Sequence, residues 1–390
     1  MSKLEALLQG VEVEWKKLWE VTTWDKKFNS VEKYKQPKTN KYKYLLASEI
    51  KPLILENGTI KLLSTNDTNW WTSEELIGNN FHEGEIVAIP WGGNPIVQYY
   101  KGRFLTGDNR IAVVNDKDYL STKFLFHYLT NNIELISSFY RGAGIKHPNM
   151  HNVLELDIPI PPIEIQQEIV RILDELTSLT NQLTTELETE RQNRKKQFEF
   201  FREQLFRFEN SNVEWKKLGE IFNMKAGKHI SSNNISKNLN SEYMFPCFGG
   251  NGIRGYVKNN NESGNYVLIG RQGALCGNVK KYNGDFYATE HAVVVKPIYK
   301  INIEFAYYLL ILMNLNQYAS KSAQPGLAVG KLESLKVAIP SLEEQERIVK
   351  LLDQFDATHT AIEEEITKEI KLRTQQYEYY REKLLSFPQN

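Results

Sequence analysis

Apolar residues recur in steps of three and four, or in sums of these steps, along residues 161–208. The stripe begins at Ile169 and Leu173 and continues to Phe208, with polar residues between its members. This spacing predicts one helix from Ile163 to Phe208, which would extend roughly 70 Å at about 1.5 Å per residue. A domain of this size needs no helix of that length in its core, and the pattern is typical of a helix that packs along another helix.

The same pattern returns 179 residues later, at residues 340–387, without a gap. Polar positions recur as well, among them Glu190, Arg194 and Gln197 of the first copy, and polar residues within a seam fix its register. We therefore expect the two helices to pack against each other as a coiled coil, and not to serve as two separate core helices. The predicted seam residues are Leu173, Leu176, Leu183, Leu187 and Phe201 in the first helix, and Leu352, Phe355, Ile362, Ile366 and Tyr380 in the second.

A second repeat has a different offset, because the hexapeptide VEWKKL occurs at 13–18 and again at 213–218. The chain thus consists of the hexapeptide, a globular segment and a long helix, followed by the same three parts. The predicted domains are globular segments at 1–158 and 211–337, and long helices at 159–210 and 338–390.

Each globular segment shows short strand patterns followed by a helical one. In the first, strands are predicted at 85–90, 96–100 and 111–114, and a helix at 122–139. In the second, 266–269 parallels the first of these strands, Gly284–Phe286 parallels Gly102–Phe104, Ala292–Val294 parallels Ala112–Val114, and 305–315 parallels the helix. The predicted fold class is α+β, with two mixed α/β modules in a pseudo-two-fold internal repeat joined by the long helices.

Composition and charge indicate the compartment of the protein and the kinds of partner it binds. Hydrophobic residues make up 41% of the chain, and no run of 18 apolar residues or signal-peptide core is present. The two cysteines, Cys247 and Cys276, form no metal-binding spacing, so we expect a cytoplasmic protein without membrane contact. The net charge of zero hides a segregation, because residues 211–337 carry 15 basic and 8 acidic residues whereas both long helices are acidic. A basic module favours a polyanion as partner, and acidic helices favour protein partners.

Several strings resemble enzyme motifs without the surroundings that those motifs need. The glycines of 250–255 spell GxGxxG, but a turn-forming stretch follows and no helix, as a dinucleotide site would require. Residues 326–331 lack the spacing and the hydroxyl residue of a phosphate-binding loop, and the seven histidines include no helical pair suited to a metal. We therefore predict no catalytic residue, no metal site and no cofactor in this chain.

Polar residues on the predicted loops suit DNA instead. Arginine pairs with guanine, and asparagine or glutamine pairs with adenine, through two hydrogen bonds, while lysine suits phosphate. For any single residue an ordinary role in a surface turn is the alternative. The candidates are Lys225, Lys228, His229, Asn251, Arg254, Arg271, Gln272, Glu290 and His291 in the second module, and Trp91, Asn94, Lys101, Arg103, Asn109, Arg110, Arg141 and Lys146 in the first.

The whole chain resembles the specificity (S) subunits of type I restriction–modification enzymes. The resemblance is carried by Ile160-Pro161-Pro162 with Gln166, by Ile339-Pro340-Ser341 with Glu344-Gln345, by the two VEWKKL copies, and by Gly270–Ala274 together with Tyr287–Ala292. The first module lacks counterparts of the last two strings.

This resemblance implies two target-recognition domains, each reading one half of an interrupted sequence in double-stranded DNA, with the helices forming an antiparallel coiled coil. It implies two methyltransferase (M) subunits, which bind S-adenosylmethionine, and restriction (R) subunits, which use ATP and Mg. The S subunit itself catalyses nothing. Three alternatives are a coiled-coil scaffold that binds only proteins, a methyltransferase with a helical arm, and a stand-alone DNA-binding regulator. Salt-sensitive DNA affinity, S-adenosylmethionine binding and co-purification with an M subunit would distinguish them.

Overall fold

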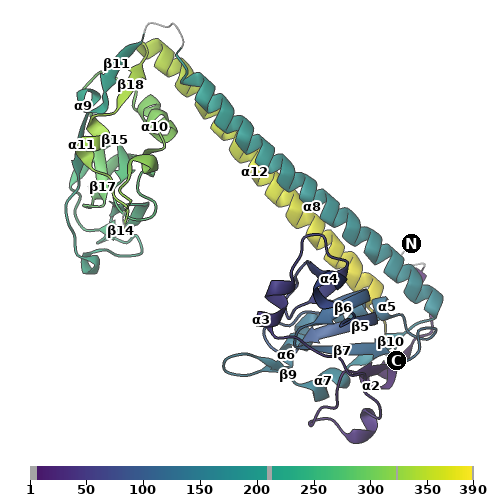
Figure 1. Cartoon of the computed structure of the whole chain (residues 1–390). Helices are drawn as coiled ribbons and strands as arrows, with labels where there is room; N and C mark the ends of the chain where they lie inside the picture. The colour runs from purple at the N-terminus through teal and green to yellow at the C-terminus, as the bar shows by residue number, and fades with distance from the viewer. Residues whose placement is uncertain (1–6, 209–212, 322–323, 389–390) are drawn as a thin grey trace. The chain divides into compact units, whose positions relative to one another are not determined.

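The computed structural model describes residues 7–208, 213–321 and 324–388. The chain forms two compact units, one from residues 1–186 with 369–390 and the other from residues 187–368. Each unit holds one globular module and one part of the pair of long helices (Figure 1). The predicted boundary at residue 210 falls among residues 209–212, which lie outside the described residues.

The first module is built on a six-stranded sheet with the order β2-β7-β5-β6-β3-β4. β5 pairs antiparallel with both β6 and β7, whereas β3 runs parallel to β6. The small sheets β1-β10 and β8-β9 accompany it. The strands are β1 (Glu14–Lys17), β2 (Thr22–Trp24), β3 (Ile60–Leu63), β4 (Trp70–Thr72), β5 (His82–Pro90), β6 (Gln98–Thr106), β7 (Asn109–Val114), β8 (Tyr140–Arg141), β9 (His147–Pro148) and β10 (Asp157–Ile160).

Successive side chains of β5 serve two cores, as the alternation of a strand requires. Val87 and Ile89 pack in the larger core, which also contains Phe124 of helix α5 (Thr122–Asn131). Ile86 and Ala88 face a smaller cluster on the other side of the sheet. The remaining helices are α2 (Leu18–Val21), η1 (Lys33–Lys35), α3 (Ala47–Ile50), η2 (Lys51–Leu53), α4 (Glu74–Ile77), α6 (Ile133–Ser138) and α7 (Met150–Leu154).

The helix predicted at 122–139 is two helices, because α5 and α6 are separated at Asn132. The Asn132 side-chain amide donates to the Tyr128 carbonyl at 2.9 Å. The break lies in the backbone of Asn132, whose φ of −99° and ψ of 24° depart from the values of an α-helix.

The second module repeats this plan. Its sheet has the order β12-β17-β15-β16-β13-β14, which is the order of the first sheet with each strand replaced by its counterpart. The strands are β11 (Glu214–Lys217), β12 (Phe222–Ala226), β13 (Phe245–Gly249), β14 (Gly252–Val257), β15 (Glu262–Gly270), β16 (Val279–Ala288), β17 (Ala292–Pro297) and β18 (Lys336–Ile339). The helices are α9 (Leu218–Ile221), η3 (Ser232–Asn234), α10 (Ile303–Leu312), η4 (Leu315–Tyr318) and α11 (Val329–Glu333).

Register confirms one predicted correspondence between the modules and corrects another. Gly102 pairs with Gly84 in the first module, and Gly284 pairs with Gly264 in the second, as the sequence parallel requires. The predicted parallel between Ala112 and Ala292 is wrong by three residues. Pro90 pairs with Asn109, and its counterpart Gly270 pairs with Ala292. Ala292 therefore corresponds to Asn109, and the next residue of β17, Val293, corresponds to Arg110. β7 begins with the polar residues Asn109 and Arg110, so the apolar pattern in the sequence starts two residues after the strand does.

The two copies of VEWKKL form equivalent edges. β1 pairs antiparallel with β10, and β11 with β18. The strands β10 and β18 each end immediately before the prolines that precede the long helices α8 (Ile163–Leu205) and α12 (Leu342–Leu385). The repeated hexapeptide thus holds the segment from which each long helix begins.

The long helices run antiparallel within each unit. In the second unit, Arg191, Phe198 and Phe201 of α8 contact Glu363, His359 and Phe355 of α12, so numbers rise on one helix as they fall on the other. In the first unit, Thr177 Oγ1 donates to Tyr377 Oη at 3.3 Å. Of the seam residues, Leu173, Leu352 and Ile366 are buried, Phe201 is exposed but stacks on Phe355 with ring centroids 5.6 Å apart, and Leu176, Leu183, Leu187, Phe355, Ile362 and Tyr380 are half-buried. None of the helices within the described residues is both long and apolar enough to cross a membrane.

Candidate nucleic-acid interface

Four turns of the second module meet at one end of its sheet. They are the segment after β12, the β13–β14 turn, the start of the β15–β16 connection and the β16–β17 turn. Most of the residues predicted from sequence to contact DNA lie on these turns. They are Lys228 and His229 on the first turn, Asn251 on the second, Arg271 and Gln272 on the third, and Glu290 and His291 on the fourth.

Close backbone contacts hold the turns together. A Cβ atom on Gly270 would lie 1.9 Å from the Gly250 carbonyl oxygen, and one on Gly227 would lie 2.1 Å from the Ala288 carbonyl oxygen. Because no larger residue fits at either position, the turns lie against one another with little freedom. Asn278 Nδ2 also donates to Asn251 Oδ1 at 2.7 Å, which fixes the asparagine on its turn.

Arg271 lies at the centre of this group. Its backbone N–H donates to the His291 carbonyl at 2.7 Å, and its own carbonyl accepts from the Leu327 N–H at 2.8 Å. The guanidinium Nη1 donates to the Glu290 carbonyl at 3.3 Å. The backbone is thus fixed independently of the side chain, and a guanidinium with five N–H donors has further donors to offer a guanine edge.

Glu290 joins the two histidines of the group. His229 Nδ1 lies 2.9 Å from Glu290 Oε1, and His291 Nε2 lies 3.4 Å from the same oxygen. Burial alone would raise the pKa of the Glu290 carboxyl, but the hydrogen bond with His229 and the charges of the two imidazoles outweigh it and lower that pKa. The carboxylate is therefore ionised near neutral pH and can accept a hydrogen bond from a cytosine amino group.

In the first module the corresponding end of the sheet is organised around Trp91. The His147 ring lies 5.3 Å from the indole, and His147 Nδ1 lies 2.7 Å from the Trp91 carbonyl oxygen. Lys26 Nζ and the Arg110 guanidinium each lie 5.0 Å from the indole centroid. The Gly93 N–H donates to the Lys146 carbonyl at 3.1 Å, which joins the β5–β6 loop, with the exposed Asn94, to the β8–β9 hairpin. The indole with the exposed Lys26 beside it suits a nucleic-acid backbone with stacked bases.

Two predicted DNA contacts of the first module are buried. Arg110 is 2% exposed and pairs with Asp25 at 2.9 Å and with Asp108, while Asn109 Nδ2 donates to the carbonyls of Leu63 and Ser64, both at 3.1 Å. The side chains of Arg110 and Asn109 therefore stabilise the loops through bonds inside the module and do not face solvent. Base contact by either one would require the loops to open.

The other predicted residues lie on strands or at their ends. Lys101 Nζ lies 3.9 Å from Glu85, and Arg103 pairs with Glu74 and lies over the Phe81 ring, so neither belongs to the group around Trp91. Arg141 is exposed in the β8–β9 hairpin opposite His147. In the second module, Lys225 on β12 and Arg254 on β14 are exposed.

Comparison with known proteins now identifies the family. The family described as "Type I restriction modification DNA specificity domain" matches residues 16–190 and again residues 210–372. The chain belongs to this family. The "Type I restriction enzyme EcoprrI specificity subunit" of Escherichia coli is 40% identical over 392 residues, which cover 93% of this chain and 92% of the relative. The "Type I restriction enzyme EcoR124I/EcoR124II specificity subunit" of Escherichia coli is 29% identical, with 100% of this chain and 98% of the relative covered.

Solved structures show the same fold at low identity. A chain from "Structural basis underlying complex assembly and conformational transition of the type I R-M system" matches with a TM-score of 0.71 and 16% identity, and covers 97% of this specificity chain and 98% of its own length. The HsdS subunit from Thermoanaerobacter tengcongensis matches with a TM-score of 0.54 and 16% identity, with 96% of both chains covered. The repeated match of the specificity domain agrees with the two modules of the structure.

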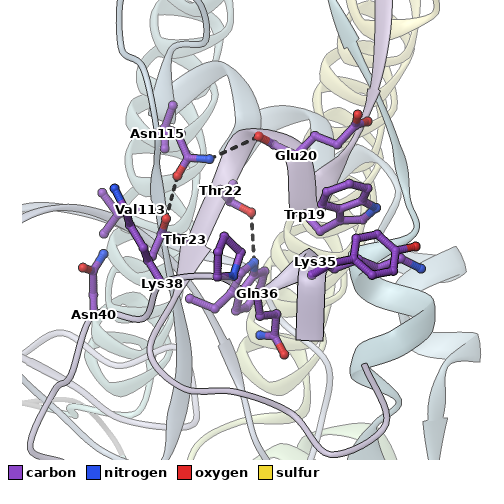
Figure 2. A pocket seen from close by; sticks show the side chains of 14 residues that line it. Trp19, Glu20, Thr22, Thr23, Lys35, Gln36, Lys38, Asn40, Val113 and Asn115 are labelled. Atoms are coloured by element: carbon purple, nitrogen blue, oxygen red, sulfur yellow. Dashed lines mark hydrogen bonds between the residues drawn. The ribbon is translucent and has the colours of Figure 1, made fainter. Parts of the chain in front are cut away.

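The first module of this specificity subunit also has a pocket of about 500 Å³ (Figure 2). Trp19 and Tyr34 form one wall with rings in an edge-to-face arrangement 5.8 Å apart. Thr23 Oγ1 donates to Asn115 Oδ1 at 2.7 Å, and Asn115 Nδ2 donates to the Glu20 carbonyl at 3.1 Å. The pocket borders the far end of β7 from Asn109, and none of the residues predicted to contact DNA lines it.

Sequence analysis missed two members of these groups. Lys26 is not among the predicted DNA contacts, although it lies over the Trp91 ring. Asn278 was not selected, although it holds Asn251. The positions that bring Lys26 to Trp91 are 65 residues apart in the sequence, so only the fold reveals the contact.

Proposed function

We propose that this chain is the DNA-recognition subunit of a type I restriction–modification complex and has no catalytic role of its own. Each module would read one half of a bipartite target, and α8 and α12 would set the separation of the modules and carry the docking sites of two M subunits. The observation behind the proposal is that one fold occurs twice in the chain, with different polar residues at the same end of each sheet. Two different readers of the same design call for two different half-sites.

The chemistry of the two groups supports DNA as the ligand. The turns of the second module present arginine, asparagine, glutamine and carboxylate side chains, and close glycine contacts hold these turns in place. These side-chain types make the hydrogen bonds of direct base readout. The basic charge of residues 211–337 supports a polyanionic partner, since the phosphates dominate affinity. Affinity should therefore fall steeply with salt concentration.

The family supports the remaining partners. Relatives are specificity subunits of type I restriction enzymes, and one solved neighbour comes from work on assembly of a type I complex. In such a complex S-adenosylmethionine would bind to the M subunits, and ATP with Mg to the R subunits, while this chain would hold no cofactor. Among the described residues, no cluster of three or more metal-ligating side chains is present.

Mapping methylated adenines in the genome of a host that carries the complete system tests the proposal. We expect one motif with two specified parts separated by a fixed number of unspecified base pairs. Replacing residues 271–278 with the corresponding loop of a relative should change only one of the two parts. A single uninterrupted motif, or a change in both parts, would contradict the assignment of one half-site to each module.

The role of the helices has its own test. Inserting seven residues into α8 and seven at the facing position of α12 preserves the seam and lengthens each helix by roughly 10 Å. The preferred gap between the half-sites should then grow by about three base pairs, at 3.4 Å for each. An insertion in α8 alone is the control, since it disrupts the pairing. A lengthened complex with an unchanged gap would show that the helices do not set the distance.

A further inference from the structure

A glutamine near the start of each long helix is completely enclosed. Gln166 is 0% exposed and Gln345 is 1% exposed, and the two are 179 residues apart, so they occupy the same place in the repeat. Gln166 Oε1 accepts from the Ser121 N–H at 2.8 Å, and its Nε2 donates to the carbonyls of Tyr119 at 3.0 Å and Pro161 at 2.8 Å. Its amide is therefore bonded on both sides.

Gln345 makes two of these three bonds at the equivalent places in the second unit. Its Oε1 accepts from the Asn302 N–H at 2.8 Å, and its Nε2 donates to the Pro340 carbonyl at 2.9 Å. Asn302 is the N-cap of α10, and Ser121, the partner of Gln166, is the N-cap of α5. In both units one amide thus ties the first turns of a long helix to the start of the helix that packs against the module's sheet.

A carboxylate two turns further along each long helix holds the same module helix again. Asp174 Oδ2 accepts from Lys123 Nζ at 2.6 Å, and Asp174 Oδ1 lies 3.2 Å from His127 Nε2. The equivalent Asp353 accepts from the Tyr308 hydroxyl at 2.7 Å. His127 and Tyr308 each lie six residues after the N-cap of their helix. The junction between long helix and module therefore has two polar ties at matching positions in both units.

Apolar packing alone would leave the angle of this junction less defined. Ile169 and Leu173 bury their side chains against the first module, but apolar contacts have little directional preference. A buried amide must satisfy its hydrogen bonds, and those bonds require a particular distance and angle. The enclosed glutamine, with the carboxylate two turns further along the long helix, thus gives the junction directional bonds.

We propose that Gln166 and Gln345 are positioning residues that set the orientation of each module on its long helix, and thereby select the gap between the two half-sites. The proposal rests on the proposed function, because the gap matters only if both modules read DNA. It adds a determinant of specificity that touches no base.

The test uses the full chain assembled with its M subunits and a series of DNA duplexes in which both half-sites are constant and the gap varies by one base pair at a time. Gln345→Met retains the size of the side chain and removes its directional bonds, whereas Gln354→Met changes an exposed glutamine of the same helix and serves as control. Gln166→Met makes the same change at the equivalent, fully buried position of the first unit and is the second variant in case Gln345→Met assembles poorly. The readout is the ratio of methylation rates between the preferred gap and its neighbours one base pair longer or shorter.

For Gln345→Met we expect this ratio to fall by about fivefold, the factor that one net hydrogen bond represents, with a fall in the same direction for Gln166→Met and none for Gln354→Met. A purely structural role would lower the rates on all gaps together and leave the ratio unchanged, and that result would overturn the proposal. If the unaltered complex itself shows no preference for one gap, the proposed function fails and not the role of the glutamines.

Discussion

Replacement of Arg110 by methionine separates two roles for this residue. Its sequence context suggested a base contact, but the structure encloses it between Asp25 and Asp108 beneath the Trp91 ring. Methionine retains much of the side-chain length and removes the charge. If Arg110 is a support, the first module should lose stability, and its contact with DNA should weaken only as a consequence.

The size of the loss follows from burial. Removing one partner of a buried ion pair costs about 3–5 kcal/mol, because the other charge remains without its partner. The Asp25 side chain is 11% exposed and the Asp108 side chain 43% exposed, so water can reach part of what remains. We therefore expect the lower end, about 3 kcal/mol. The double variant Arg110→Met with Asp25→Asn should recover most of this, because asparagine keeps an acceptor for the Ile111 N–H, which donates to Asp25 Oδ1 at 3.1 Å.

Amide hydrogen exchange in β7 measures this loss within the correct unit. The equivalent strand β17 of the same molecule is the internal control, since a neutral Val293 stands there in place of Arg110 and its exchange should not change. DNA binding is measured in parallel on a duplex with both half-sites intact and on a duplex in which the first half-site is altered. Unchanged exchange in β7 together with weaker binding would refute the supporting role and restore Arg110 as a DNA contact.

The same variant has an expected pH dependence. Burial raises the pKa of the Asp25 carboxyl, against the opposing effect of the Arg110 charge. Without Arg110 that pKa should rise further. A carboxyl with a higher pKa in the folded than in the unfolded state loses stability as the pH rises through its folded value. The defect of Arg110→Met should therefore be smaller at about pH 5 than at about pH 8, whereas loss of a DNA contact alone would leave stability at both pH values unchanged.

Three further substitutions test the junction between module and long helix at His127, the proposed DNA contact of Arg271, and the seam between the long helices at Leu173. Burial lowers the pKa of His127 despite its bond with Asp174, so the first unit should lose stability as the pH falls below about 6.5. The variant His127→Tyr introduces the residue of the second module at this position. In denaturant titrations it should abolish the loss of stability at low pH. Arg271→Ala should weaken binding to one half-site by about 1–3 kcal/mol, and an equal loss on unrelated DNA in the same titration would indicate a phosphate contact. Leu173→Ala should lower the free energy of unfolding by about 2–5 kcal/mol. Leu179→Ala, at a position that is 57% exposed, should lower it by about 0.5 kcal/mol or less. Equal losses for the two variants would contradict the assigned seam.

Periodicity was sufficient for the long helices because their partner is in the same sequence. The seam positions Leu173 and Leu352 follow from spacing alone, and both are fully buried. The break at Asn132 was less accessible, since it depends on the backbone conformation of one residue. A change of conformation at one residue leaves the apolar spacing on both sides intact, so the sequence pattern continues through the break.

The reading groups were harder to predict, because their members come from separate parts of the chain. The turns with Arg271 and His291 were selected from residue type, and the structure places them in contact. The enclosure of Arg110 could not be predicted, since Asp25 lies 85 residues earlier. An arginine at the start of a strand has the same local appearance whether it faces solvent or a buried carboxylate.

The two modules carry different side chains at the turns proposed to contact DNA and matching hydrogen bonds at their junctions with the long helices. Beneath the turns, the first module has a buried arginine with two carboxylates where the second has Val293. At the junction, Gln166 and Gln345 make matching bonds to the backbone. A change of target sequence can therefore alter the turns and the side chains beneath them, while each module keeps its fixed attachment to its long helix. Different turns on matching junctions support the proposal that the chain reads two unlike half-sites at one set distance.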